Sequence, residues 1–139
     1  MFVVVGEALV DLVGPRGGRT LEAHPGGSPA NVALGLGRLG DTVTLKTRLG
    51  RDAFGEMILG HLEDLVDTVG AGDSFTSGLL HGLHRADLLG GTRREGLAAI
   101  DEATLVSVVD SAAIIAAITC SRPGADPPTR DEVEARRTR

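Results

Sequence analysis

The nine residues 66–74, VDTVGAGDS, hold the arrangement in this sequence that could most directly do chemistry. Gly70, Ala71 and Gly72 have little or no side chain, so their backbone N–H groups can converge on one anion. The helix expected to follow adds the positive end of its dipole and its unpaired N–H groups. Such a turn suits phosphate oxygens, or the charge that develops during phosphoryl transfer.

Asp73 stands at the start of that helix, beside the predicted anion site. A carboxylate there would repel a phosphate, but it could act as a general base that removes a proton from an attacking hydroxyl. An aspartate at a helix N-terminus also commonly caps the helix. The turn alone leaves both roles open.

Two other patterns suggest different chemistry. His81, His84 and Asp87 fall on one stripe of a predicted helix and could hold a metal ion, although a solvated helix face is the expected interpretation. No metal site is therefore predicted with these residues. Ser74 and Ser77 could be hydrolase nucleophiles, but neither follows a strand in the manner of a nucleophile elbow, and we discount that role.

The composition is that of a soluble globular protein, with 42% hydrophobic and 24% charged residues in 139. This length predicts a single domain, 1–139. The net charge of −5 and the lack of Tyr and Trp argue against nucleic-acid binding. The apolar start lacks a basic segment and is interrupted by Glu7 and Asp11, which predicts a first strand instead of a signal peptide, and a cytoplasmic location.

The segment 104–120 is apolar all round. It is short for a membrane span, and Asp110 lies near its middle, so the sequence favours a buried helix and no membrane association. Cys120, the single cysteine, lies in this run and is predicted to be a buried, unreactive thiol.

The elements that must position these residues follow an α/β pattern with few strands. Only two strands are predicted, and they would make a small sheet with exposed edges. One expectation is therefore a homodimer in which strands of both chains complete one sheet. The sequence predicts strands over 2–5 and 42–49, a loop or flap over 12–27, and helices over 28–39, 54–65, 73–85, 94–100, 102–119 and 130–138, with Ser28 as the N-cap of the first helix.

Several stretches resemble the ribokinase-like sugar kinases, the PfkB family, in the order in which that family has them. VDTVGAGDSF is similar to the family's C-terminal signature, and the tail resembles that of fructokinase-like members. The stretches are GEALVDLV (6–13), GGSPANVALGLGRLG (26–40), LGRDAFGEMIL (49–59), VDTVGAGDSF (66–75) and ITCSRPGADPPTRDEVEA (118–135).

The resemblance implies a role for each matching residue. Asp73 corresponds to the catalytic base, and the flap over 12–27 to the family's lid. The other implied roles are the anion hole (Gly70, Ala71, Gly72), the sugar hydroxyls (Asp11, Gly26, Gly27, Asn31) and the vicinity of the cation and phosphates (Asp67, Thr68).

The sequence departs from the family between Leu65 and Val66, where the family has several βα units with an Asn-x-x-Glu motif tied to magnesium and a Gly-rich nucleotide loop. The resemblance therefore implies a truncated ribokinase-like, Rossmann-like three-layer fold, with a sugar-side part over 1–65 and a catalytic part over 66–139. ATP and magnesium serve the parent family, and most of the ATP platform is expected to be lost here. We expect a remnant of a sugar kinase with little or no activity alone. There are two alternatives. One is an active minimal sugar kinase that works as an oligomer. The other is a non-catalytic unit, which either binds a sugar or phosphate or is purely structural.

Overall fold

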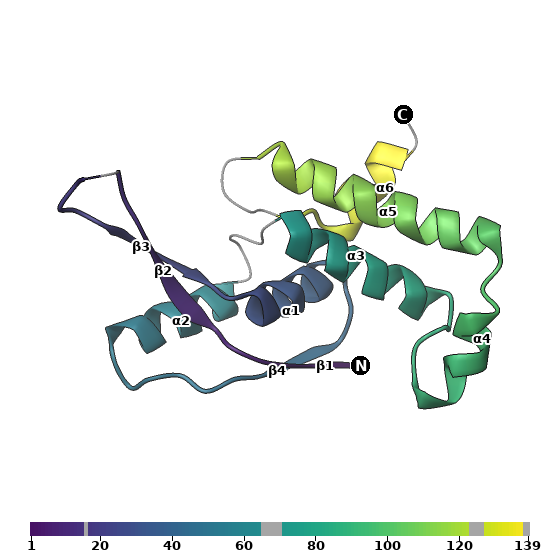
Figure 1. Cartoon of the computed structure of the whole chain (residues 1–139), viewed down its shortest axis with the longest axis horizontal. Coiled ribbons are helices and arrows are strands. Elements are labelled where there is room, and N and C mark those ends of the chain that lie inside the picture. Colours follow the sequence, from purple (N-terminus) through teal and green to yellow (C-terminus); the bar gives the residue numbers. More distant parts are fainter. Residues whose placement is uncertain (16, 65–70, 123–126, 138–139) are drawn as a thin grey trace.

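The computed structural model describes residues 1–15, 17–64, 71–122 and 127–137 (Figure 1). Most of these residues are helical, and the strands are few and short, which confirms the predicted helix-rich α/β fold. The predicted helices are all present, with ends shifted by a few residues. In chain order the elements are β1 (Phe2–Val5), β2 (Leu9–Val13), β3 (Glu22–Gly26), α1 (Ser28–Arg38), β4 (Val43–Lys46), α2 (Ala53–Asp64), α3 (Ala71–Arg85), a 3₁₀ turn η1 (Gly91–Arg93), α4 (Arg94–Ala98), α5 (Glu102–Cys120) and α6 (Arg130–Arg137).

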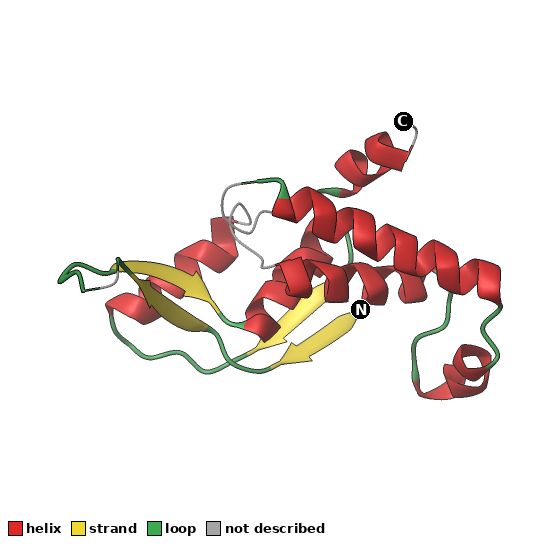
Figure 2. Cartoon of the chain, turned by 45° about the horizontal axis from the view of Figure 1, so that its top comes forward, coloured by secondary structure: helices red, strands yellow, loops and turns green. Residues whose placement is uncertain are grey.

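β1 and β4 form a parallel pair in which Phe2 lies opposite Val43 and Val5 lies opposite Lys46. Side chains alternate between the two faces of such a pair. One face packs against α1, whereas Val3 and Val5 on the other face are exposed. Figure 2 shows the helices stacked on one side of these strands. Within the described part of the chain, this face of the sheet has no covering layer, and it carries Thr44 and Lys46 of β4 beside the two valines.

β2 and β3 form an antiparallel hairpin where the sequence predicted a loop over 12–27, so that prediction is wrong in part. Leu9 lies opposite Gly26, and Val10 lies opposite Pro25. The hairpin has no third strand among the described residues, and Pro25 is tolerated because an edge strand can spare its N–H. α2 packs against both strands of the hairpin.

The N-cap of α1 is Gly27, not Ser28 as the sequence predicted. Gly27 has a φ of 107°, and a Cβ there would lie 2.9 Å from the carbonyl oxygen of Glu7. Glycine adopts this conformation without strain. The Gly27 carbonyl accepts a hydrogen bond from the N–H of Asn31 at 2.9 Å, and Pro29 lies in the first turn, where its missing N–H costs no helical bond.

α3 and α5 lie side by side because glycines on α3 let the two backbones approach (Figures 1 and 2). A Cβ at Gly78 would lie 2.8 Å from the Cα of Ala112, and a Cβ at Gly82 would lie 3.0 Å from Val108. Residues four apart share one helix face, so the two glycines form one continuous strip of contact.

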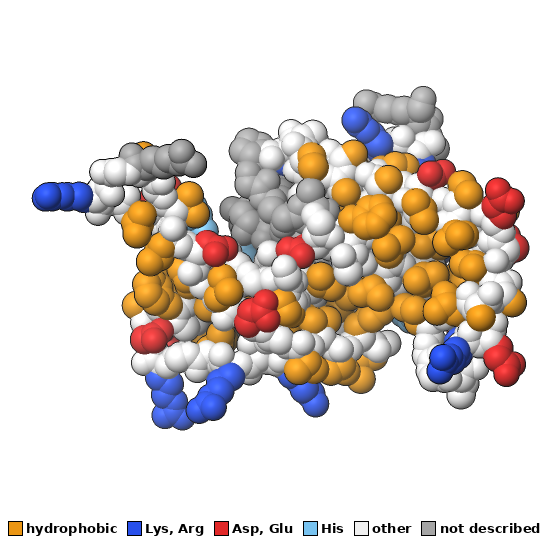
Figure 3. All heavy atoms as spheres, viewed as in Figure 1, with side chains coloured by type: hydrophobic (Ala, Val, Ile, Leu, Met, Phe, Trp, Pro, Cys, Tyr) orange, Lys and Arg blue, Asp and Glu red, His pale blue; other side chains and the backbone are white. Residues whose placement is uncertain are grey.

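α5 buries one face only, which corrects the prediction of a buried helix. Leu105, Val106 and Val109 are exposed, and Figure 3 shows apolar side chains gathered over this helix. Cys120 is also exposed, so the prediction of a buried thiol is wrong. The reason is that α5 is apolar all round while α3 covers one side of it. α5 is, in the described ranges, the one helix that meets the length and composition of a membrane span, with a mean hydropathy of 1.9 over its most apolar 18 residues.

α6 returns the chain to the end of α1. Arg130 donates from Nε and Nη2 to the carbonyl oxygen of Leu39, at 3.2 and 2.9 Å. Beneath this contact, apolar residues from α5, α6 and the end of α1 pack into one cluster. Its buried members are Leu39, Ile115, Ile118 and Val133.

The first turn of α6 carries a cap that the pattern Thr-x-x-Glu encodes. The Oε2 atom of Glu132 accepts hydrogen bonds from the N–H of Thr129 at 2.7 Å and from its hydroxyl at 3.1 Å. Arg122 pairs with the same carboxylate. These partners hold the pKa of Glu132 below its ordinary value of 4.5. The hydrogen bond from the Thr129 N–H has the largest effect, and the hydrogen bond from Arg122 comes next.

Replacing Glu132 with glutamine is expected to lower the free energy of unfolding at neutral pH by about 0.5–1 kcal/mol, because the cap and ion pair lose their charge at an exposed site. A lowered carboxylate pKa stabilises the fold above the unfolded-state value, and that contribution disappears as the pH falls through the folded-state value. Melting temperatures of Glu132→Gln and the parent chain should therefore converge as the pH falls below 4.5.

Asp131 lies in the same turn and has no hydrogen bond or ion pair with the described residues, so Asp131→Asn is the matched control. Its melting temperature should differ little from that of the parent chain at any pH. A difference for Glu132→Gln that persists unchanged at acid pH would contradict the charged cap.

Candidate functional site

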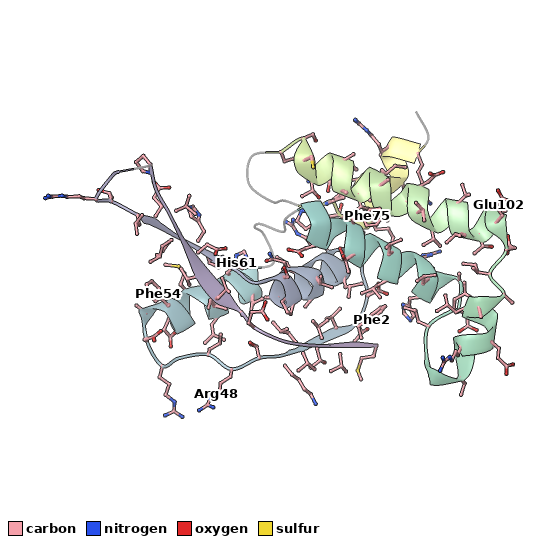
Figure 4. All side chains as sticks on the ribbon, viewed as in Figure 1. Phe2, Arg48, Phe54, His61, Phe75 and Glu102 are labelled. Atoms are coloured by element: carbon pink, nitrogen blue, oxygen red, sulfur yellow. The ribbon has the colours of Figure 1, made fainter. Side chains whose placement is uncertain are left out.

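The first turn of α3 brings Asp73 against the first turns of α1. The Nδ2 atom of Asn31 donates a hydrogen bond to Oδ2 of Asp73 at 3.1 Å, across 42 residues of sequence. Both side chains are partly buried. Figure 4, in which the neighbouring Phe75 is labelled, shows this end of α3 lying toward α1 and α2. A carboxylate and an amide thus meet at an accessible surface, where both can bind a hydroxyl.

The contact between Asn31 and Asp73 depends on how α1 packs against α3. A Cβ at Gly35 would lie 2.5 Å from Oγ of Ser77, so a side chain at this position would push the helices apart. Gly35 and Ser77 are both buried. The first turns of the two helices are therefore held at hydrogen-bonding distance by small residues one turn further along each helix.

Asp11 and Gly26 lie together on the hairpin, just before α1. Oδ2 of Asp11 is 2.8 Å from the position that a Cβ would take at Gly26. Because Gly26 has no side chain, the Asp11 carboxylate can lie over its backbone. Gly27 follows as the N-cap of α1, four residues before Asn31. The structure thus places Asp11, Gly26, Gly27 and Asn31 on one continuous stretch of hairpin and helix.

The predicted anion hole is described only in part. Gly70 lies outside the described residues, as do Asp67 and Thr68. Ala71 and Gly72 form the start of α3, where backbone N–H groups have no partner within the helix. A Cβ at Gly72 would meet nothing within 4 Å, so the backbone there faces open space.

Two cavities lined by described residues lie elsewhere and include neither Asn31 nor Asp73. The open first turn of α3 fits a phosphate group, which needs N–H donors and access. A nucleoside also needs an enclosing, largely apolar pocket. Neither of these two cavities places such a pocket at Asp73.

Ser74 and Ser77 are buried and hydrogen-bonded, which removes them as nucleophiles. Oγ of Ser74 accepts a hydrogen bond from Thr119 at 3.0 Å, and Oγ of Ser77 donates to the carbonyl oxygen of Ser74 at 3.0 Å. Both serines are fully buried. They pack α3 against α5 and α1, and a substrate cannot reach them in this conformation.

The histidines of α3 bind a carboxylate that sequence reasoning missed. Nδ1 of His81 lies 2.7 Å from one oxygen of Asp41, and Nδ1 of His84 lies 2.9 Å from the other. Asp87 instead pairs with Arg93, at 2.6 Å. The three residues that the sequence placed on one stripe are therefore not brought to a common point. The spacing of the two histidines was the one signal of a shared partner.

Comparison with known proteins matches this chain to the model of the pfkB family of carbohydrate kinases, over residues 1–65 and 63–132. The chain belongs to the pfkB family. This confirms the predicted resemblance. The match has two segments that meet at residues 63–65, next to the position where the sequence departs from the family.

Several relatives are named as sugar kinases. The uncharacterized sugar kinase PH1459 of Pyrococcus horikoshii is 43% identical over 76 residues, which are 50% of this chain and 24% of that protein. A fructokinase of Escherichia coli is 49% identical over 55 residues, which are 40% of this chain and 18% of that protein. The chain therefore spans about a quarter or less of the length of the relatives it matches.

Among solved structures, the Pyrococcus horikoshii sugar kinase in complex with ATP is 38% identical, with a TM-score of 0.43, over 47% of this chain and 23% of that one. The fructokinase of Halothermothrix orenii is 43% identical, with a TM-score of 0.40, over 46% of this chain and 25% of that one.

Proposed function

We propose that this chain is a shortened member of the pfkB family, derived from an ATP-dependent sugar kinase, with little or no turnover on its own. The observation that supports this is the hydrogen bond between Asn31 and Asp73. Asn31 corresponds to a sugar-binding residue of the family, and Asp73 to its catalytic base. A fold that brings them together keeps the sugar side of the site.

Each residue of that side has a proposed role toward a small sugar, fructose among the candidates. Asp11 and Asn31 bind vicinal hydroxyls, because carboxylate and amide groups accept and donate hydrogen bonds in pairs. Gly26 and Gly27 let a sugar ring lie close to the backbone. Asp73 takes the proton of the attacking hydroxyl.

The same assignments give the N-terminal turn of α3 the role of anion hole, through Gly70, Ala71 and Gly72, and give Asp67 and Thr68 a place near a cation and phosphates. In the family ATP supplies the phosphoryl group and magnesium offsets its charge. We assign no nucleotide pocket among the described residues, so no transfer step is assigned to this chain alone. Its two parts, 1–65 and 66–139, are proposed to form one domain in the cytoplasm.

Purified chain incubated with magnesium-ATP and a panel of sugars, including fructose and ribose, is expected to release almost no sugar-dependent ADP. Kinases turn over at about 1–100 s⁻¹. The loss of one oxyanion-type donor already lowers the rate of an enzyme by about 10²–10³. We therefore expect the turnover of this chain to be more than about a thousandfold below that range for kinases. Coupled detection of ADP checks this.

The informative variant for that assay is Asp73→Asn, with Asp131→Asn as a control on an exposed helix far along the chain. If the chain releases ADP, and Asp73→Asn abolishes that release while Asp131→Asn preserves it, the proposal of an inactive remnant is wrong. The result would favour an active oligomer. The two-stranded β1–β4 sheet is the observation that favours this second candidate, because each strand has an unpaired edge among the described residues at which a strand of a second copy could extend the sheet.

A further inference from the structure

A cavity of about 500 Å³ lies between α3, α5, α6 and the end of α1, away from Asp73. The α3 residues that line it are His81, Gly82 and Arg85, which follow Asp73 by 8 to 12 positions, about 12–18 Å along the helix. Its volume is in the range of small-molecule sites. The proposed function does not use this cavity.

The charged side chains around the cavity are mostly positive. Arg85, Arg130 and Arg137 line it, and Glu134 is the one acidic residue among the lining residues. None of the three arginines forms a salt bridge with an acidic side chain in the described part of the chain. In a protein of net charge −5, three arginines without acidic partners around one cavity create a local positive potential.

Two of these arginines are held in place by neutral partners. Arg130 donates to the carbonyl oxygen of Leu39, and Arg137 donates to Oγ of Ser111. A guanidinium has five N–H donors, so both retain donors for a ligand. Arg85, in the last turn of α3, is exposed and lines the same cavity. Guanidinium groups from α3 and α6 around one cavity suit the oxygens of a phosphate, which a guanidinium can bind in pairs.

The floor of the cavity is apolar. Leu39, Val108, Ile115 and Val133 line it and are buried members of the core. The hydroxyl groups of Thr104 and Ser107 lie at the α5 side. A ligand that matches both parts carries a phosphate at one end and an apolar group, such as an aromatic ring, at the other.

We propose that this cavity binds a phosphate monoester with an apolar body, with the phosphate on Arg85, Arg130 and Arg137 and the apolar group on the floor formed by Leu39, Val108, Ile115 and Val133. The site is separate from the proposed sugar site. Its binding therefore does not depend on kinase activity, and failure of one proposal leaves the other standing.

Phenyl phosphate is the probe, followed by ¹H–¹⁵N NMR of the whole chain. We expect saturable shifts for amides in α3, α5 and α6 around the cavity. Arg85→Gln and Arg137→Gln should each weaken binding by about tenfold or more, since each removes charge-assisted hydrogen bonds. Arg94→Gln on α4, which does not line the cavity, is the matched control and should bind as the parent chain does.

Inorganic phosphate and phenol separate the two halves of the site, and each should bind more weakly than phenyl phosphate. Phenol that binds as tightly would overturn the role of the arginines, and inorganic phosphate that binds as tightly would overturn the role of the floor. The absence of saturable shifts up to about 10 mM phenyl phosphate would overturn the site altogether. Arg85 is exposed, so its variant remains informative if Arg137→Gln fails to fold.

Discussion

Replacing Leu36 with alanine is expected to lower the free energy of unfolding by about 3–5 kcal/mol. Leu36 lies in α1 and is 0% exposed, so the substitution removes buried apolar surface and leaves a cavity where α1 meets α3 and the β1–β4 pair. Folded domains are stable by about 5–15 kcal/mol in all, so this is a large part of the total. Urea unfolding followed by circular dichroism measures it, since the chain has no Trp or Tyr.

Leu105→Ala is the matched control for that measurement. Leu105 is also a leucine in a helix, but it is 45% exposed on the outer face of α5. Its substitution should change the free energy of unfolding by less than about 1 kcal/mol. Equal effects of the two substitutions would mean that α1 is not the buried helix of this fold.

Alanine at Gly78 is expected to lower the free energy of unfolding by about 1–3 kcal/mol, although alanine favours a helix more than glycine does. The added Cβ would lie 2.8 Å from the Cα of Ala112 and 3.0 Å from Cδ1 of Ile115. Since Ala112 Cα belongs to the backbone, α3 and α5 must move apart to admit it. Chemical denaturation of the variant and the parent chain gives the difference.

The same substitution at Gly60 should have the opposite sign. Gly60 lies inside α2, and a Cβ there would meet nothing within 4 Å. Gly60→Ala should therefore stabilise the chain by about 0.5–1 kcal/mol through helix propensity alone. If Gly78→Ala also stabilises, the close approach of α3 and α5 does not exist in solution.

The helices could be predicted from the sequence because their signals are local. Apolar spacing, Pro29 in the first turn and Gly40 after the last turn delimit α1 without reference to any other element. The hairpin could not be predicted in the same way. β3 contains Pro25 and Gly26, which are unfavourable in strands, and pairing with β2 and packing against α2 outweigh that local preference.

The candidate site shows the same division between local and long-range information. The residue types in the turn at Asp73 were enough to predict an anion site and a general base. The resemblance to the family added Asn31 as a sugar-binding residue. The hydrogen bond between them depends on the approach of α1 to α3 at Gly35, which no local pattern encodes. Asp41 was missed for that reason too, because its partners, His81 and His84, lie about 40 residues further along the chain.

The long separations of these contacts have a consequence for how fast the chain folds. The pairing of β1 with β4 closes a loop that contains the hairpin and α1. Asn31 meets Asp73 across 42 residues, and Thr119 meets Ser74 across 45. Closing such loops costs chain entropy before any contact forms. A mostly helical chain with contacts this distant in sequence should fold more slowly than a helical bundle of the same length, whose contacts are local.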